Sequence, residues 1–326
     1  MAVSSPIPDS TPAEIRLGII LTTLAALLLP VLDAAAKLLG ENHGIPAGEI
    51  ALARFALQAL LSLPLMLWQE GPAGLKPSDL ALNLFRGVLL ALGSFFFFMA
   101  LKAMPIADAI AIFFVEPMVI TILSALMLGE KIGWRRALAV LTGFIGALIV
   151  IRPNFAVLGL VAILPALSAV CLAVYLVLGR KLSRGSSPLS MHFYAGIGGT
   201  LFLAGIIAIG ARLEVAELTL VMPADAFSWS LMFVVGLVGM IGHLMFGYAY
   251  RMAPGSVLAP FGYFEIVTAT LFGLVLFGDF PDAMKWLGIA IIIASGVYIV
   301  WRESVVGKRT QTQANTGTAA ESAQHP

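Results

Sequence analysis

Two glutamates in the middle of long apolar stretches are the residues best suited to chemistry in this sequence. Glu116 lies near the centre of residues 106–128, and Glu265 lies within residues 256–277. A helix over the first stretch rises about 34 Å at roughly 1.5 Å per residue, enough to cross a hydrocarbon core of about 30 Å. A carboxylate at that depth is costly and usually has a function. We therefore expect both glutamates to bind a solute or a proton; the alternative is a structural, hydrogen-bonded or protonated side chain.

A proline accompanies each glutamate. Pro117 follows Glu116 directly, and Pro260 lies one and a half turns before Glu265. Proline lacks an N–H, and its ring displaces the carbonyl four residues earlier, so we expect both prolines to kink their helices. Backbone groups freed at membrane depth are tolerated where they face protein or a watery cavity. A charge and a broken hydrogen bond at one depth therefore predict a central cavity.

Four further polar side chains lie within apolar stretches and form a second set of candidate binding residues. Asp33 and Lys37 are spaced to pair on one helix face, and Arg54 lies five residues into the next stretch. His243 follows glycines that recur every third residue over 236–242, a face that permits close helix contact. Each candidate also has a structural interpretation, because Lys and Arg can snorkel to the interface and a lone buried His is usually a packing residue.

The amino-acid composition indicates which kind of secondary structure carries these residues. The 326 residues are 60% hydrophobic and 11% charged, with a mean hydropathy of +0.99, whereas a soluble domain has about 25% charged residues. This composition indicates a helical membrane protein, and the net charge of +1 gives no sign of a nucleic-acid partner. The single cysteine excludes an intramolecular disulfide, and the four histidines lack metal-ligand spacing. We expect neither a metal nor a cofactor.

The apolar pattern predicts an all-α integral membrane protein with ten transmembrane helices and short loops. We expect residues 1–14 to be a cytoplasmic N-terminal segment and residues 303–326, which are polar, to be a disordered cytoplasmic tail. The expected spans are residues 15–39, 49–68, 80–101, 106–128, 133–151, 156–179, 188–210, 227–250, 256–277 and 283–301.

The ten spans form two repeats of five, over residues 15–152 and 153–302. With an offset of 149 residues, the equivalent pairs are Lys102 and Arg251, Pro105 and Pro254, Glu116 and Glu265, Gly129 and Gly278, and Glu130 and Asp279. Five is an odd number, so the second repeat must cross the membrane in the opposite sense to the first. Inverted repeats are typical of secondary transporters, whose solute site lies near the midplane between the halves.

The distribution of Lys and Arg predicts the orientation. If the N-terminus is inside, twelve of the 19 Lys and Arg residues lie in cytoplasmic segments, four in outer segments and three within spans. Cytoplasmic loops carry the excess of positive charge in membrane proteins. We therefore expect both termini to face the cytoplasm.

Several motifs resemble one family. They are Arg54-Phe55-Ala56-Leu57, the Ala-Leu-Lys-Ala-Met-Pro run ending at Pro105, the Leu-Met-Leu-Gly-Glu-Lys run at 126–131, and the spacing of Trp134, Gly143, Gly146 and Arg152-Pro153. Over residues 15–302 the chain resembles the EamA-type members of the drug/metabolite transporter superfamily. The resemblance implies ten spans, a central cavity, alternating access and transport of small organic metabolites. The Glu116-Pro117 pair departs from a common pattern in which an apolar residue precedes that proline.

We therefore expect a secondary transporter, not driven by ATP, that moves a small polar or aromatic metabolite across the bacterial inner membrane. No GxxxxGK[ST] loop is present. Paired carboxylates suit a cation or a donor-rich solute, and nearby tyrosines suit a flat ring, so a vitamin such as riboflavin fits. The alternatives are an exporter of amino acids or drug-like compounds and an intramembrane lipid-modifying enzyme, although no catalytic constellation is visible. Expected partners are the solute, membrane lipid and, through the glycine-rich faces, a second copy of the chain.

Overall fold

The computed structural model is mainly helical over the residues it describes, and no strand occurs among them. Six of the described helical segments are long and apolar enough to cross a membrane: Pro12–Asn42, Ala47–Leu75, Leu80–Leu101, Gly159–Gly179, Pro188–Arg212 and Ala226–Met252. The protein is therefore an all-helical, multi-pass membrane protein. The structure describes residues 11–128, 159–182, 186–253 and 264–291, together with isolated positions within 138–149, 258–262 and 293–301.

The first three helices follow the predicted spans closely. Their bounds are Pro12–Asn42 for α1, Ala47–Glu70 for α2, with the 3₁₀ turn η1 over Gly71–Leu75, and Leu80–Leu101 for α3. Helix α1 begins three residues before its predicted start because Thr11 and Glu14 form a capping box. The Thr11 hydroxyl accepts from the Glu14 N–H at 3.3 Å, and the Glu14 carboxylate accepts from the Thr11 N–H at 2.7 Å.

The single helix expected over residues 106–128 is two helices in the structure. Helix α4 covers Ile106–Phe113 and helix α5 covers Glu116–Leu128. Residues 114 and 115 form a turn between them, directly before Glu116. Pro117 has no N–H to donate to the Phe113 carbonyl, so the helical ladder is interrupted at this point. The break lies where the sequence predicts a kink, whereas Pro260 lies outside the described residues.

The described part of the second half contains three long helices, α7, α8 and α9, and one irregular helix, α11 with η4. Their bounds are Gly159–Ile163 for the 3₁₀ turn η2, Leu164–Leu182 for α7, Pro188–Arg212 for α8, Ala216–Leu218 for η3, Ala226–Met252 for α9, Phe264–Phe272 for α11 and Gly273–Phe277 for the π-helical segment η4. A shorter apolar helix follows over Ala283–Ser295. Most of the span expected over residues 133–151 lies outside the described residues.

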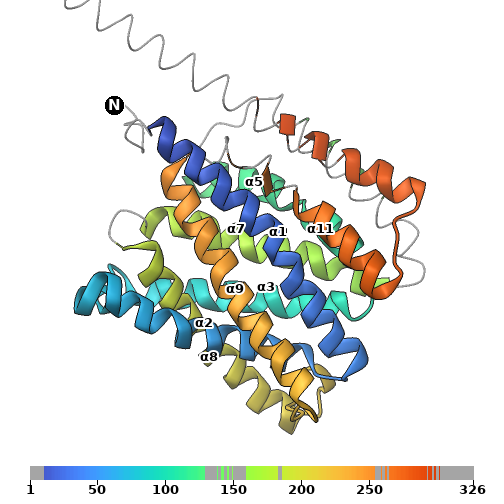
Figure 1. Cartoon of the computed structure of the whole chain (residues 1–326), viewed down its shortest axis with the longest axis horizontal. Coiled ribbons are helices and arrows are strands. Elements are labelled where there is room, and N and C mark those ends of the chain that lie inside the picture. The colour runs from blue at the N-terminus through green and yellow to red at the C-terminus, as the bar shows by residue number, and fades with distance from the viewer. Residues whose placement is uncertain are drawn as a thin grey trace, which may run out of the picture.

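Helices of the first half pack directly on helices of the second half. In Figure 1, α1 and α9 lie side by side, α2 lies along α8, and α3 contacts both α7 and α8. Helix α11 packs on α1 and α4. The polar candidates of the two halves are therefore brought together inside one bundle.

Glycines allow the closest of these contacts. On α9, a Cβ added at Gly236 would lie 2.4 Å from Leu57, and one at Gly239 would lie 3.0 Å from Arg54 Nε. The predicted close contact along the glycine face of α9 is therefore confirmed. Helices α3 and α8 are closer still, because a Cβ at Gly87 or Gly198 would lie 2.2 Å from a backbone carbonyl of the other helix.

Candidate functional site

Arg54 of α2 connects three helices at the centre of the site. Its side chain is only 3% exposed, so it does not snorkel to the interface as one interpretation of the sequence allowed. One terminal nitrogen donates to the Ser94 hydroxyl on α3, and the other lies 3.0 Å from Nε2 of His243 on α9. A buried guanidinium held by side chains of two other helices is fixed in position and can serve as an anchor for a ligand.

The contacts of His243 define its tautomer. Its Nδ1 lies 3.0 Å from the Gly239 carbonyl oxygen, and its Nε2 faces Arg54. A guanidinium can only donate, so Nε2 must accept, and Nδ1 carries the proton and donates to the carbonyl. The imidazole is therefore neutral in this arrangement. His243 holds Arg54 in place and lies beside the candidate site.

Carboxylates from three other helices form a chain of electrostatic interactions that begins at Arg54. Asp33 on α1 is 6% exposed and interacts electrostatically with Arg54. Glu265 on α11 interacts electrostatically with Asp33 and with Glu116, the first residue of α5. Within the described part of the chain, no hydrogen bond reaches the carboxylates of Asp33 and Glu265. These two acceptors are therefore available to a ligand with positive charge or hydrogen-bond donors.

Lys37 lies outside this cluster, which corrects the expectation that it pairs with Asp33. Its ammonium donates to Glu41 Oε1 at 2.6 Å and to the carbonyls of Leu101 and Met104 at 2.8 and 2.9 Å. These contacts use all three of its protons. Carbonyls at the C-terminal end of α3 have no helical partner, and a buried ammonium satisfies them. In this conformation the Lys37 ammonium therefore has no proton left to donate to Asp33.

Two of the three tyrosines near the candidate residues in sequence are described by the structure. Tyr248 donates to Gln69 Oε1 at 3.2 Å near the end of α9, Tyr250 is exposed, and Tyr263 lies outside the described residues. Phe113, three residues before Glu116, forms an edge-to-face pair with Phe97 of α3, with ring centroids 5.4 Å apart. Phe113 ends α4 immediately before the helix break.

His192 and Gln58 belong to the polar cluster and were not selected from the sequence. His192 on α8 is 3% exposed and interacts electrostatically with Arg54 and His243. Gln58, one turn after Arg54 on α2, donates to the His192 carbonyl at 2.8 Å. A lone histidine and a lone glutamine within apolar spans have no spacing signal, so sequence reasoning missed both.

A set of contacts closes one end of the bundle, where α1 ends and α9 begins. We call it the α8–α9 clasp; its residues are His43, Ala47, Glu49, Lys102, Glu217, Val221, Asp225 and Ser228. Glu217 pairs with Lys102 and accepts from the Ala47 N–H at 2.8 Å, and Glu49 accepts from the Val221 N–H at 2.6 Å. The Ser228 hydroxyl lies 2.9 Å from His43 Nδ1.

Asp225 caps α9 at this end of the bundle. Its carboxylate accepts from the Ser228 N–H at 2.7 Å, and this hydrogen bond lowers the pKa of Asp225 below its usual value. A lowered pKa means that the cap is complete at neutral pH and is lost only as the pH falls through that lowered value. The N-terminal cap of α9 is therefore intact at neutral pH.

The comparisons with known proteins agree with this architecture. A sequence model of the EamA-like transporter family matches the chain twice, over residues 16–152 and 159–301. The chain therefore belongs to the EamA-like transporter family, and the resemblance found in the sequence is confirmed. A solved crystal structure, 20% identical, matches with a TM-score of 0.61 over 87% of this chain and 96% of that chain, which shows the fold alone.

Curated relatives cover most of the chain. A riboflavin transporter of Brucella anthropi is 29% identical over 83% of this chain and 94% of its own. An S-adenosylmethionine uptake transporter of Rickettsia bellii is 26% identical over 83% of this chain and 89% of its own. The pseudopaline exporter CntI of Pseudomonas aeruginosa is 29% identical over 88% of this chain and 94% of its own. All three are named as transporters.

Proposed function

We propose that the protein is a secondary transporter that moves a small polar or aromatic metabolite across the bacterial inner membrane by alternating access. The observation that carries the proposal is the charged cluster of Asp33, Arg54, Glu116 and Glu265, which joins helices of both halves at membrane depth. Ionisable groups within spans are costly and mark solute or proton pathways. The family assignment favours this function over an intramembrane lipid-modifying enzyme.

The cluster has two chemically different sides, and these define the proposed solute. Asp33 and Glu265 offer carboxylate oxygens, whereas Arg54 offers a guanidinium supported by Ser94 and His243. A solute that carries both donor-rich or cationic groups and acceptor groups would satisfy both sides. Riboflavin and S-adenosylmethionine, named for relatives, are the first candidates to test.

The proposed transport cycle uses two inverted five-helix repeats and ten spans. The two consecutive matches to one family model support the repeat, as does the equivalence of Glu116 with Glu265 in the sequence. The bias of Lys and Arg supports a cytoplasmic location for both termini. In this orientation the α8–α9 clasp closes the outer end, and it must open when the site is exposed to the outside.

Counterflow in proteoliposomes tests this function. Vesicles that contain the purified protein and unlabelled riboflavin or S-adenosylmethionine are diluted into the labelled compound. We expect labelled solute to accumulate transiently and at a saturable rate for at least one of a panel of small metabolites that includes these two. Uptake that rises linearly with concentration, without counterflow, would indicate a passive channel and contradict the proposal.

A further inference from the structure

Helix α4 is a short, buried helix that is separated from α5 by a break. It covers Ile106–Phe113, and every residue from Ile106 to Ile112 is buried. Residues 114 and 115 form a turn, and α5 begins with Glu116. Hinges are typically a few residues at the ends of such elements, because those residues absorb a change in the backbone angles. The break therefore allows α4 to tilt without moving α5.

A buried ion pair fastens the start of α4 to the apolar helix over Ala283–Ser295. The ammonium of Lys285 lies 2.6 Å from Oδ2 of Asp108, and the two side chains are 13% and 1% exposed. Asp108 belongs to the first half of the chain and Lys285 to the second half. The ion pair therefore joins the two halves close to the break that follows α4.

The position of each partner shows what the ion pair does. Asp108 lies in the first turn of α4, where the positive end of the helix dipole favours a carboxylate. The Lys285 N–H donates to Asp282 Oδ1 at 2.8 Å, which places Lys285 in the first turn of its helix, where a cation is unfavourable. Asp108 offsets this cost. Burial removes both charges from water, and separation into an aqueous opening would hydrate them again, so the ion pair is easier to part than its short distance implies.

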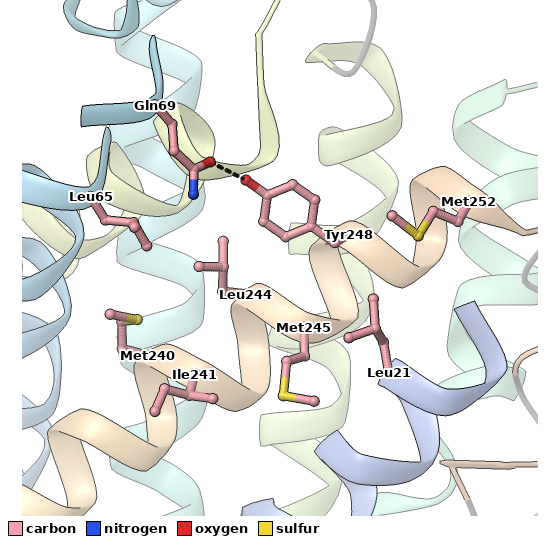
Figure 2. Close-up of a pocket in the computed structure, with 9 residues that line it drawn as sticks. All are labelled: Leu21, Leu65, Gln69, Met240, Ile241, Leu244, Met245, Tyr248 and Met252. Carbon is pink, nitrogen blue, oxygen red and sulfur yellow. Dashed lines mark hydrogen bonds between the residues drawn. The ribbon is translucent and has the colours of Figure 1, made fainter. Parts of the chain in front are cut away.

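Other charged contacts lie at the same end of the bundle. This end also contains the ion pairs Lys37–Glu41 and Lys102–Glu217. At the opposite end of α9, Figure 2 shows the neutral hydrogen bond between Tyr248 and Gln69 beside an open apolar groove. Charged contacts therefore hold together the end of the bundle that the bias of Lys and Arg places outside.

We propose that α4 is a gate helix, with residues 114 and 115 as its hinge and the Asp108–Lys285 ion pair as its latch. When the ion pair separates, α4 tilts away from the helix over Ala283–Ser295 and opens a path from the outer side to Glu116. The proposal rests on the transport function proposed above, and it adds a moving element to the α8–α9 clasp.

Thiol labelling of a buried reporter tests the latch without any solute. The reporter is Ala111→Cys, at a position of α4 that is 0% exposed, in a Cys171→Ala background that has no other cysteine. A charged maleimide reacts only when α4 has moved, so the labelling rate of the folded protein follows the population of the open form. Lys285→Met removes the positive partner and should raise this rate roughly tenfold or more.

Matched variants separate the latch from general loosening. Lys285→Arg keeps the ion pair, and Lys76→Met removes an exposed lysine at the other end of α3, so both should be labelled as slowly as the reporter protein itself. Ala195→Cys, a buried reporter on α8, should react slowly with or without Lys285→Met. If Lys285→Met does not fold, Asp108→Asn breaks the same ion pair.

Two results would overturn the proposal. One is that Lys285→Met labels the α4 reporter no faster than Lys76→Met does. The other is that it accelerates labelling of the α8 reporter as strongly, which would indicate general loosening of the fold. Because labelling uses no solute, failure of the latch can be distinguished from failure of counterflow, which would contradict the transport function itself.

Discussion

Arg54→Met is expected to destabilise the protein by about 1–3 kcal/mol, because buried polar partners lose their hydrogen-bond donor, and to abolish solute binding. The substitution also removes the positive charge that interacts with the buried Asp33. Ser94 and His243 also lose the donor that they share. The effect on binding should exceed the effect expected from stability alone, because Arg54 is the positive side of the proposed solute site.

Arg86→Met separates these two effects. Arg86 is as buried as Arg54, but its Nε donates to the Tyr175 carbonyl at 3.1 Å and its guanidinium lies 4.2 Å from the centre of the Tyr175 ring. The Arg86→Met variant should therefore have a lower unfolding temperature than the wild type but should still bind the solute. Adding Asp33→Asn to Arg54→Met should recover stability, since both charges are then removed, but not binding. Solute binding by folded Arg54→Met at wild-type affinity would rule out the anchoring role.

Gly198→Ala is the second substitution with a large expected effect. The added methyl group would lie 2.2 Å from the Leu84 carbonyl oxygen of α3, and a backbone atom cannot rotate away as a side chain can. Helices α3 and α8 would have to separate, which costs about 1–3 kcal/mol or more for overpacking. Since α8 carries His192 and α3 carries Ser94, the polar cluster should also be displaced. Thermal unfolding and solute titration measure the two consequences.

Gly205→Ala is the matched control on the same helix. No atom lies within 4 Å of a Cβ added at Gly205, so only helix propensity changes. Alanine is better than glycine within a helix by about 0.5–1 kcal/mol, so this variant should be as stable as the wild type or slightly more stable. Equal unfolding temperatures for Gly198→Ala and Gly205→Ala would show that the α3–α8 contact is looser than the structure indicates.

The regular spans could be predicted from the sequence because long apolar runs and polar breaks determine them. The predicted range for α3 equals its observed bounds, and α1 extends three residues beyond its predicted range at each end, at its start because of the Thr11–Glu14 capping box. The turn before Glu116 was indicated by Pro117, but the sequence did not show that two separate helices would result. The sequence predicts where a backbone hydrogen bond of the helix is missing. Packing against other helices determines whether the helix bends there or divides into two.

The candidate site could be predicted in part. Asp33, Arg54, Glu265 and His243 were selected as costly polar residues within spans, and the structure brings them close to one another. Lys37 met the same criterion, but its partners are carbonyls far along the chain, which no local pattern reveals.

His192 was missed for a related reason. A single histidine within an apolar span has no spacing signal of its own, and its interaction partners Arg54 and His243 lie far away along the chain.

A binding screen that compares wild type with Glu265→Gln tests the central claim most directly. The unfolding temperature of the wild type, Glu265→Gln and the exposed-loop control Glu214→Gln is measured with riboflavin, S-adenosylmethionine and a panel of small metabolites. We predict that at least one compound stabilises the wild type and Glu214→Gln but not Glu265→Gln. If the same compounds stabilise all three proteins equally, Glu265 is not a solute ligand and the charged cluster has a structural role.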